Sequence, residues 1–392
     1  MKNITTHQRR YDLDWLRIIA FGLLIFYHIG MFYVSWGWHV KSVHAGPWSE
    51  PAMRLLNPWR LSLLFLISGV AIRFAIDKAE LGSFSWRRFW RLFLPLVFGM
   101  LTIVAPQSWL ELVTKGETHK GFFEFYPDYI KGGFSILTPT WNHLWYLAYI
   151  LVYTFLIIPL ARPLARFMRG IGGQMTALIF GGRLGVVSVM ILPFLPHMLY
   201  RVFLDPFHPT THDLINDWAN HAHSFTIFFM GFVIAKDTAF WKAVERALPW
   251  AGVLTLVLAL WLSIVWYDWS AYIEAGHNLW PARTGRVLFA WLVILTLLGL
   301  AQKYLNQPSK ALTYMTEAIF PWYILHQTLI VVTGYWMTRQ GMNAFSEFLA
   351  VSASTLAGCF LLHEFIIRRL KPLRPLLGLQ LQSNDSFALL EK

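Results

Sequence analysis

The feature that most constrains this chain is a series of long apolar stretches separated by short polar connections. We place about ten such stretches, each near the length of about 20 residues that spans a bilayer as an α-helix. They lie near residues 13–35, 55–76, 92–110, 142–161, 184–204, 219–235, 248–267, 286–304, 312–337 and 345–367. The pattern predicts an all-α integral membrane protein that folds as a bundle of about ten transmembrane helices.

Composition supports a membrane protein and disfavours a soluble enzyme, a disordered regulator or a fibrous protein. Hydrophobic residues make up 56% of the chain and charged residues only 14%, whereas soluble domains carry about 25% charged residues. Cys359 is the single cysteine, so a disulfide within the chain and a zinc cluster of cysteines are excluded.

The basic residues alternate from one connection to the next, which matters more than the net charge of +12. By the positive-inside rule this pattern predicts that both chain ends lie in the cytoplasm, and an even number of spans agrees with it. We therefore expect a cytoplasmic segment 1–12, one membrane domain 13–370 and a cytoplasmic tail 371–392, with no cleaved signal peptide and no nucleic-acid partner. The lipid bilayer is the predicted environment, and the oligomeric state stays open.

The first apolar stretch carries ionisable residues that share one helix face. Arg17 and His28 are eleven positions apart, which brings them within about 20° of the same face and about 16 Å apart along the axis. Asp14 extends this stripe. His28 would lie near the middle of the bilayer and Arg17 at its cytoplasmic side, an arrangement that suits a charged donor arriving from the cytoplasm. The alternative is that Arg17 reaches lipid headgroups and His28 bonds a neighbouring carbonyl.

Other candidates follow along the chain. Because the uncharged stretch after Arg60 is too short to cross the bilayer, Arg60 or Arg73 must enter it. Arg60 would bind a carboxylate or acidic acceptor, or else pair with an outer acid, Asp205 or Asp217.

His143 and Trp145 begin the fourth stretch at the outer side, where Trp145 suits interfacial anchoring and His143 could contact an acceptor. Glu364 lies in the last stretch, and a buried acid of this kind would orient a histidine or an arginine.

The outer connections are rich in histidine and tryptophan. A metal site is one interpretation of His208, His212, His221, His223, Asp213 and Asp217, but a His-x-His spacing on a helix splays the two rings. We therefore predict no metal. Trp218, Trp266, Trp269 and Trp280 favour a surface on which sugars stack.

Several motifs appear in the order typical of one enzyme family. They are Leu13-Asp14-Trp15-Leu16-Arg17 with His28, Trp59-Arg60 with Phe65–Gly69, Arg87–Pro95, His143-Leu144-Trp145-Tyr146-Leu147, Phe229–Phe232, Phe320–His326 and His363-Glu364. In these motifs the chain resembles the membrane acyltransferase-3 family, multi-span enzymes that O-acylate extracytoplasmic glycans. The stretch from His28 to Ser42 is most similar to the branch that succinylates osmoregulated periplasmic glucans.

This resemblance implies a function and a location. It implies a bacterial inner-membrane acyltransferase that moves a succinyl or acetyl group from succinyl-CoA or acetyl-CoA to a hydroxyl of a periplasmic glycan. Acyl-CoA would then be a co-substrate, and no cofactor would be bound permanently.

The chemistry suggests a role for each candidate. His28 is our choice of catalytic base, with Asp14, Tyr323 and His326 in the catalytic set and Arg60, Tyr323 or His326 as donors to the oxyanion. Arg17, Arg88 and Arg91 would bind the phosphates of CoA. We predict that Arg60, His143, Trp145 and Glu364 contact substrate.

A transporter is the competing class. The same polar residues could carry a lipid-linked sugar or an anion, with His28 and Glu364 as a proton relay. The enzyme hypothesis predicts a channel from the inner arginines past His28 to an outer aromatic pocket. It leaves open whether the acyl group passes directly or rests first on His28 or Ser68.

Overall fold

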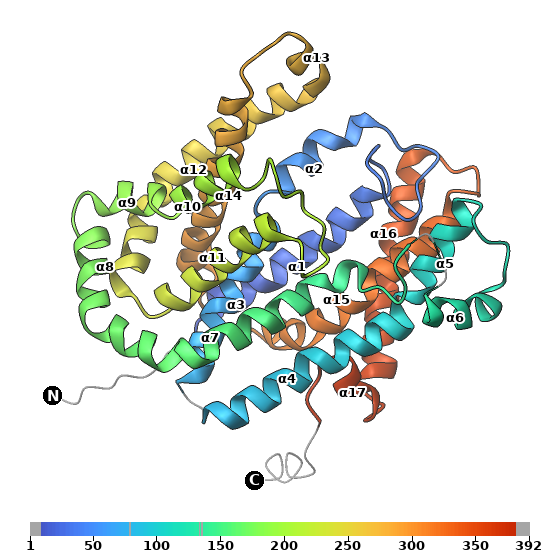
Figure 1. The fold of residues 1–392 in the computed structure, drawn as a ribbon, viewed down its shortest axis with the longest axis horizontal. Helices are drawn as coiled ribbons and strands as arrows, with labels where there is room; N and C mark the ends of the chain where they lie inside the picture. Colours follow the sequence, from blue (N-terminus) through green and yellow to red (C-terminus); the bar gives the residue numbers. More distant parts are fainter. Residues whose placement is uncertain (1–8, 78–79, 133, 135, 382–392) are drawn as a thin grey trace.

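A computed structural model describes residues 9–77, 80–132, 134 and 136–381, and these residues form helices joined by loops, with no strand among them (Figure 1). The longer helices are α1 (Tyr11–Met31), α3 (Arg60–Ile76), α4 (Leu81–Phe98), α7 (Trp145–Arg169), α11 (Trp218–Ile234), α12 (Thr238–Tyr267), α14 (Leu279–Tyr304), α15 (Lys310–Met337) and α16 (Ala344–Leu361). The shorter ones are α2 (Glu50–Leu56), α5 (Ala105–Thr114), α6 (Phe122–Lys131), α8 (Ile171–Gly181), α9 (Gly185–Ile191), α10 (Phe194–Phe203), α13 (Trp269–Glu274) and α17 (Leu373–Leu376). Short 3-10 or π-helical turns are η1 (Pro47–Ser49), η2 (Gly99–Ile103), η3 (Asn142–Leu144) and η4 (Leu362–Ile367).

Every predicted apolar stretch overlaps one helix or several consecutive helical elements, but the expected number of spans is not confirmed. Among the described residues, eight helical segments are long and apolar enough to cross a membrane. Neither α11 nor α15 is among them. The former has 17 residues, and the latter includes the polar residues Glu317, His326 and Gln327. The predicted segments 1–12 and 371–392 lie partly outside the described residues.

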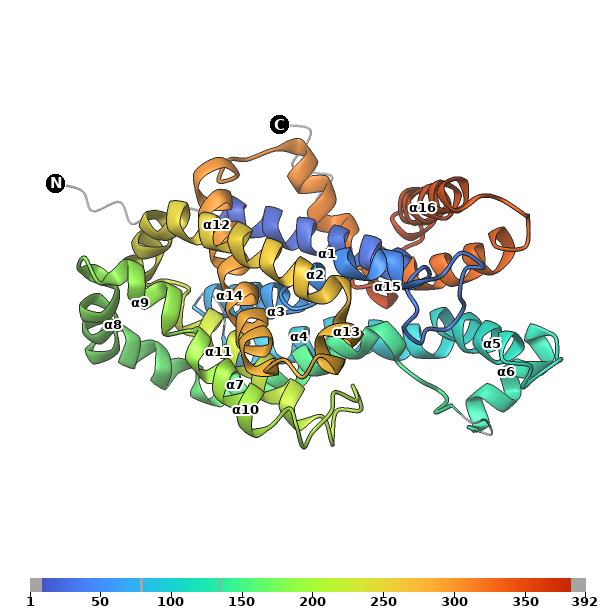
Figure 2. The same cartoon turned by 90° about the horizontal axis from the view of Figure 1, so that it is seen from above.

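Helix α1 packs against α3, α14 and α15 (Figures 1 and 2). Its buried side chains come from several faces and include Leu16, Phe21 and Tyr27. Helix α16 covers the outer side of α15 (Figure 2). Residues of α1 and α15, which are about 300 positions apart in sequence, therefore meet in the interior, and these two helices carry the histidines described below.

Helices α3 and α11 approach so closely that only glycine fits at two positions of the crossing. A Cβ atom added at Gly69 would lie 1.9 Å from the backbone oxygen of Phe228, and one added at Gly231 would lie 2.1 Å from that of Leu66. Small residues allow this kind of backbone contact between helices in a membrane, where packing replaces the hydrophobic driving force. This crossing fixes α3, and with it Arg60.

We expect Gly69→Ala to destabilise the protein, because the added methyl group would push α3 away from the backbone of α11. Overpacking of this kind costs about 1–3 kcal/mol. Thermal unfolding of the purified protein in detergent should show a lower midpoint for this variant. Gly22→Ala on α1 is the matched control, since nothing lies within 4 Å of the added methyl group. Equal midpoints for the two variants would contradict the close contact.

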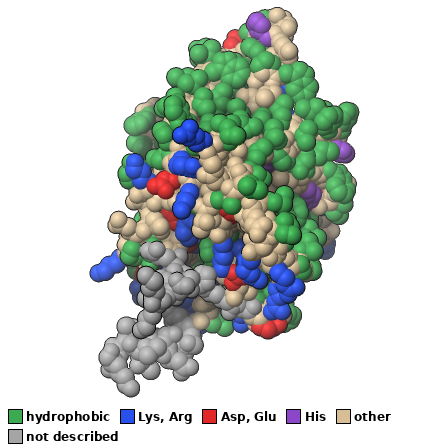
Figure 3. Space-filling model, turned by 90° about the vertical axis from the view of Figure 1, so that its left-hand side faces the viewer, with side chains coloured by type: hydrophobic (Ala, Val, Ile, Leu, Met, Phe, Trp, Pro, Cys, Tyr) green, Lys and Arg blue, Asp and Glu red, His purple; other side chains and the backbone are tan. Residues whose placement is uncertain are grey.

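The surface separates apolar and basic side chains. On the face shown in Figure 3, lysine and arginine gather in one part, while hydrophobic side chains cover most of the remainder. Exposed hydrophobic residues on the membrane-length helices, such as Leu256, Leu260 and Ile264 of α12, are 67%, 68% and 76% exposed. A surface of this kind suits a chain surrounded by lipid.

Candidate active site

Two histidines from distant parts of the chain are joined by a hydrogen bond. His28, near the end of α1, and His326, in the middle of α15, place Nδ1 and Nε2 2.7 Å apart. Their rings are nearly parallel, with an interplanar angle of 6°. His326 is fully buried. The prediction placed both residues in the catalytic set, and the structure brings them into direct contact.

The hydrogen-bond partners determine which ring nitrogens carry protons when both imidazoles are neutral. Nδ1 of His326 lies 2.7 Å from the carbonyl oxygen of Tyr323, and a carbonyl can only accept. This nitrogen therefore carries the proton, and Nε2 of His326 is the acceptor. Nδ1 of His28 must then donate to it, which leaves Nε2 of His28 with a free lone pair.

His143 completes a group of three imidazoles. It belongs to η3, just before α7, and its ring lies 5.1 Å from that of His326, centroid to centroid. Its Nε2 donates to the carbonyl of Ile324 at 3.1 Å, and its buried Nδ1 has no partner among the described residues. The hydroxyl of Tyr323 donates to the backbone oxygen of His143 at 2.6 Å, so this tyrosine holds the histidine in place.

A cavity of about 880 Å³ opens beside these residues. Of the predicted site residues, it is lined by His28, Arg60, His143, Trp145 and Tyr323. His326 lies behind His28, outside the cavity lining. Nε2 of His28 forms no hydrogen bond with a described residue, so the free lone pair is available to a molecule in the cavity.

The aromatic lining differs from the one expected. Trp38, Trp141, Trp145 and Trp291 line the cavity, whereas Trp218, Trp266, Trp269 and Trp280 do not. Trp145 stacks on His212, with ring centroids 4.2 Å apart. Burial lowers the pKa of His212 below its ordinary value, so this imidazole is neutral near pH 7 and adds another flat ring to the wall.

A layer of rings separates the cavity from the arginines predicted to bind CoA. Phe21 contacts Tyr323 and Tyr146, with ring centroids 5.1 and 6.0 Å apart. On α1, Phe21 lies between Arg17 and His28. Arg17, Arg88 and Arg91 do not line the cavity. The cavity therefore does not extend to these arginines as the expected continuous channel would, and the rings of Phe21, Tyr146 and Tyr323 pack against one another beside it.

Arg17, Arg88 and Arg91 lie together on the other side of the layer. Arg88 of α4 lies within electrostatic range of Arg17 and Arg91, and its buried Nε has no partner in the described part of the chain. The hydroxyl of Tyr146 lies within electrostatic range of Arg88 and Arg17. It forms a hydrogen bond of 3.1 Å with the hydroxyl of Ser68. Tyr146 thus lines the cavity and also lies within electrostatic range of the basic cluster.

Asp14 and Glu364 lie away from the cavity. Asp14 accepts from Arg9 at 2.8 Å and lies 3.3 Å from Arg17, so it belongs to the basic end of α1. Glu364, in the π-helical turn η4, pairs with Arg368 at 2.9 Å and accepts from the hydroxyl of Tyr314. The structure therefore does not bring Glu364 to the cavity. Glu364 instead orients Arg368 near the beginning of α15.

Asp205 and Asp217, the acids predicted at the outer side, pair with residues other than Arg60. Asp205 pairs with Arg201 at 2.6 Å and with His223 at 3.1 Å. Asp217 accepts from the hydroxyl of Tyr149 at 2.5 Å and from backbone amides of Thr211 and His212. In the described residues, no group of three or more His, Cys, Asp or Glu is arranged to hold a metal ion.

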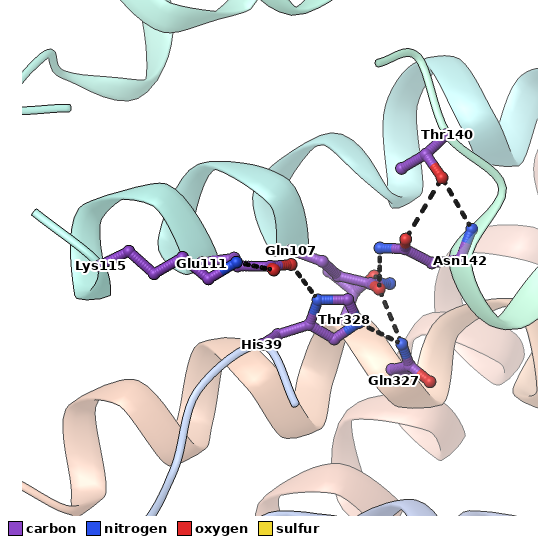
Figure 4. Close-up of polar contacts among 8 residues, drawn as sticks. All are labelled: His39, Gln107, Glu111, Lys115, Thr140, Asn142, Gln327 and Thr328. Carbon is purple, nitrogen blue, oxygen red and sulfur yellow. Dashed lines mark hydrogen bonds and ion pairs between the residues drawn. The ribbon is translucent and has the colours of Figure 1, made fainter. Parts of the chain in front are cut away.

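A network of hydrogen bonds beside the histidines was missed by sequence analysis (Figure 4). His39 bonds the carboxylate of Glu111 through Nδ1 at 2.5 Å and accepts from the amide of Gln327 through Nε2 at 3.0 Å. The Gln327 amide also donates to Gln107, which accepts from Asn142 in turn. Since Gln327 follows His326 directly and lines the cavity with Asn142, this network fixes the cavity wall.

Comparison with known proteins now identifies the family. A family model described as "Acyltransferase domain" matches residues 10–364. The chain is 23% identical over 366 residues to the glucans biosynthesis protein C of Shigella dysenteriae serotype 1 (strain Sd197), and 23% identical over 367 residues to that of Escherichia coli (strain K12). Each alignment covers 92% of both chains. No solved structure matches. The chain belongs to the acyltransferase domain family, as the order of its motifs predicted.

Proposed function

We propose that this membrane acyltransferase moves an acyl group from cytoplasmic acyl-CoA to a hydroxyl of a periplasmic glycan, with both chain ends in the cytoplasm of a bacterium and the helices in its inner membrane. The observation that carries the proposal is the free Nε2 of His28, held in one tautomer by His326 and open to a cavity lined with aromatic rings. Aromatic faces suit the flat apolar sides of sugar rings.

His28 would act as the general base. Its Nε2 takes the proton from the sugar hydroxyl as the oxygen attacks the carbonyl carbon of the thioester. The tetrahedral oxyanion collapses, the bond to sulfur breaks, and the proton passes from His28 to the leaving CoA sulfur. An arginine such as Arg60, which lines the same cavity, can stabilise the oxyanion. Direct transfer needs no acyl-enzyme on His28 or Ser68.

The inner arginines would hold the nucleotide end of the donor. Arg17, Arg88 and Arg91 form a basic cluster without a carboxylate partner for Arg88 or Arg91 in the described residues. Guanidinium groups bind phosphates in bidentate fashion. The thioester end must then pass Phe21, Tyr146 and Tyr323 to reach His28, so the ring layer has to open during the reaction.

For the donor and acceptor we propose a succinyl group and a periplasmic glucan. This choice rests on the similarity to glucans biosynthesis protein C and on the excess of arginine around the cavity. Acetyl-CoA is the alternative donor.

The test uses the purified protein in nanodiscs with labelled acyl-CoA and periplasmic glucan. Mass spectrometry of the glucan should show an added acyl ester, and free CoA should appear in equal amount. A control without glucan should release little CoA. If the protein instead moved a lipid-linked sugar across a vesicle membrane without consuming thioester, the transporter function would replace this proposal.

A further inference from the structure

The cavity has more positive charge than its own carboxylates neutralise. Three arginines line it, Arg60, Arg201 and Arg286, together with a single carboxylate, that of Asp205. Arg201 and His223 already occupy the oxygens of Asp205, at 2.6 and 3.1 Å. Arg60 and Arg286 therefore lack a carboxylate partner among the described residues.

Arg60 is held in place by neutral groups only. It is 6% exposed, and its Nη1 donates to the backbone and side-chain oxygens of Asn57 at 2.9 and 2.8 Å. Its guanidinium carbon lies 3.4 Å from the ring centroid of Tyr27. Nε is buried without a partner. Stacking on a ring orients the guanidinium, but none of these contacts neutralises the charge.

Arg286 has fewer contacts still. It lies near the beginning of α14, lines the same cavity, and forms no hydrogen bond or ion pair with a described residue. The groups within electrostatic range include Arg201, Arg60, Asp205 and Tyr27. Arg286 therefore lies within electrostatic range of both Arg60 and the tyrosine on which Arg60 stacks. Like charges inside a protein are costly unless an anion lies between them.

This pair of arginines is close to the proposed base. Tyr27 precedes His28 in α1, and their ring centroids are 5.9 Å apart. The charge of Arg60 also lies within electrostatic range of the His28 imidazole. An anion held by Arg60 and Arg286 would thus lie at the end of the cavity where the acyl group is transferred.

We propose that Arg60 and Arg286 form a carboxylate-binding site next to His28, and that Arg286 determines specificity for a substrate that carries an anionic group near the reacting carbonyl or hydroxyl. The proposal rests on the proposed function. Two sources could supply the anion: the distal carboxylate of a dicarboxylic acyl group, or an acidic substituent on the glycan. Planar guanidinium forks match a carboxylate in either case.

The experiment compares wild-type protein, Arg286→Gln and Arg286→Lys in nanodiscs. Succinyl-CoA is compared with butyryl-CoA, whose acyl group has a methyl in place of the carboxylate, and each donor is tested with a neutral and an anionic glucan. If the acyl group supplies the anion, Arg286→Gln should lower kcat/KM for succinyl-CoA by about 10- to 100-fold. The same variant should change transfer from butyryl-CoA little. Arg286→Lys should retain part of the preference for succinyl-CoA over butyryl-CoA.

If the glycan supplies the anion, Arg286→Gln should lower kcat/KM for the anionic glucan with both acyl donors and leave the neutral glucan little changed. Equal rates for wild type and Arg286→Gln, or an equal loss in all four combinations, would overturn the site while the acyltransferase function stands. Absence of any transfer by the wild-type protein would instead refute the proposed function.

Arg283→Gln is the matched control, since Arg283 is one turn earlier on α14, lies over Trp280 and does not line the cavity. Its kcat/KM should equal that of the wild type with every donor. If Arg286→Gln does not fold, inhibition by free succinate supplies the second measurement: it should be weaker for Arg286→Lys than for wild type, and equal inhibition would contradict the site.

Discussion

Replacing His28 with asparagine should reduce acyl transfer by about 10²- to 10⁴-fold, the usual contribution of a general base, and leave the protein folded. The side-chain amide of asparagine occupies nearly the position of the imidazole Nδ1, so it can still donate to Nε2 of His326. It provides nothing at the position of Nε2. The variant therefore removes the proposed base and keeps the buried hydrogen bond.

Two measurements check this prediction. The rate of ester formation on glucan should fall, and the affinity for acyl-CoA, measured by binding to the same nanodiscs, should stay near the wild-type value. His277→Asn is the matched control, because His277 lies on an exposed loop outside the cavity, and it should transfer at the wild-type rate. Transfer by the His28 variant within threefold of wild type would rule out His28 as the base.

Replacing His326 with leucine should lower kcat by about 10²-fold, although His326 does not line the cavity. Leucine cannot accept a hydrogen bond, so the Nδ1–H of His28 would lose its partner and the ring could adopt either tautomer. An unsatisfied buried donor costs about 1–3 kcal/mol, so most of the His28 population would then have the proton on Nε2, where it cannot act as a base.

A second substitution at His326 distinguishes a hydrogen-bonding role from simple packing. His326→Gln can place an amide oxygen where Nε2 was, so it should recover at least part of the rate that His326→Leu loses. The KM for acyl-CoA should not change in either variant, because His326 acts through His28. Equal losses in the glutamine and leucine variants would show that His326 only fills space, and an unchanged rate in both would remove it from the mechanism.

Helix positions could be predicted from the sequence because apolar length is a local property. The ends of α1, α7 and α14 lie within about ten residues of the stretches placed by hydropathy. The number of spans was less predictable, since α15 mixes polar residues with apolar ones. The polar side chains of α15 form hydrogen bonds with residues of other helices, such as His28 and Gln107. These partners cannot be deduced from the sequence of α15 alone.

Side-chain partners were mostly beyond prediction. Helical spacing predicted one helix face for Arg17 and His28, and motif order pointed to His143 and His326. Spacing within one helix cannot show that His326 of α15 meets His28. Arg286 was overlooked because an arginine at the start of an apolar stretch is typical of a helix end. Glu111 and His39 are in different segments, and only their packing shows the pair.

The ring layer of Phe21, Tyr146 and Tyr323 has a consequence for the cell that makes this protein. A passage for an acyl chain across a bilayer would also leak protons and metabolites if it stayed open, and would dissipate the ion gradients that energise the membrane. In the proposed function, the three packed aromatic side chains would keep such a passage closed between turnovers. An acyl chain that passes between the three rings would itself occupy the space that opens. The passage would then conduct few ions at any stage of a turnover.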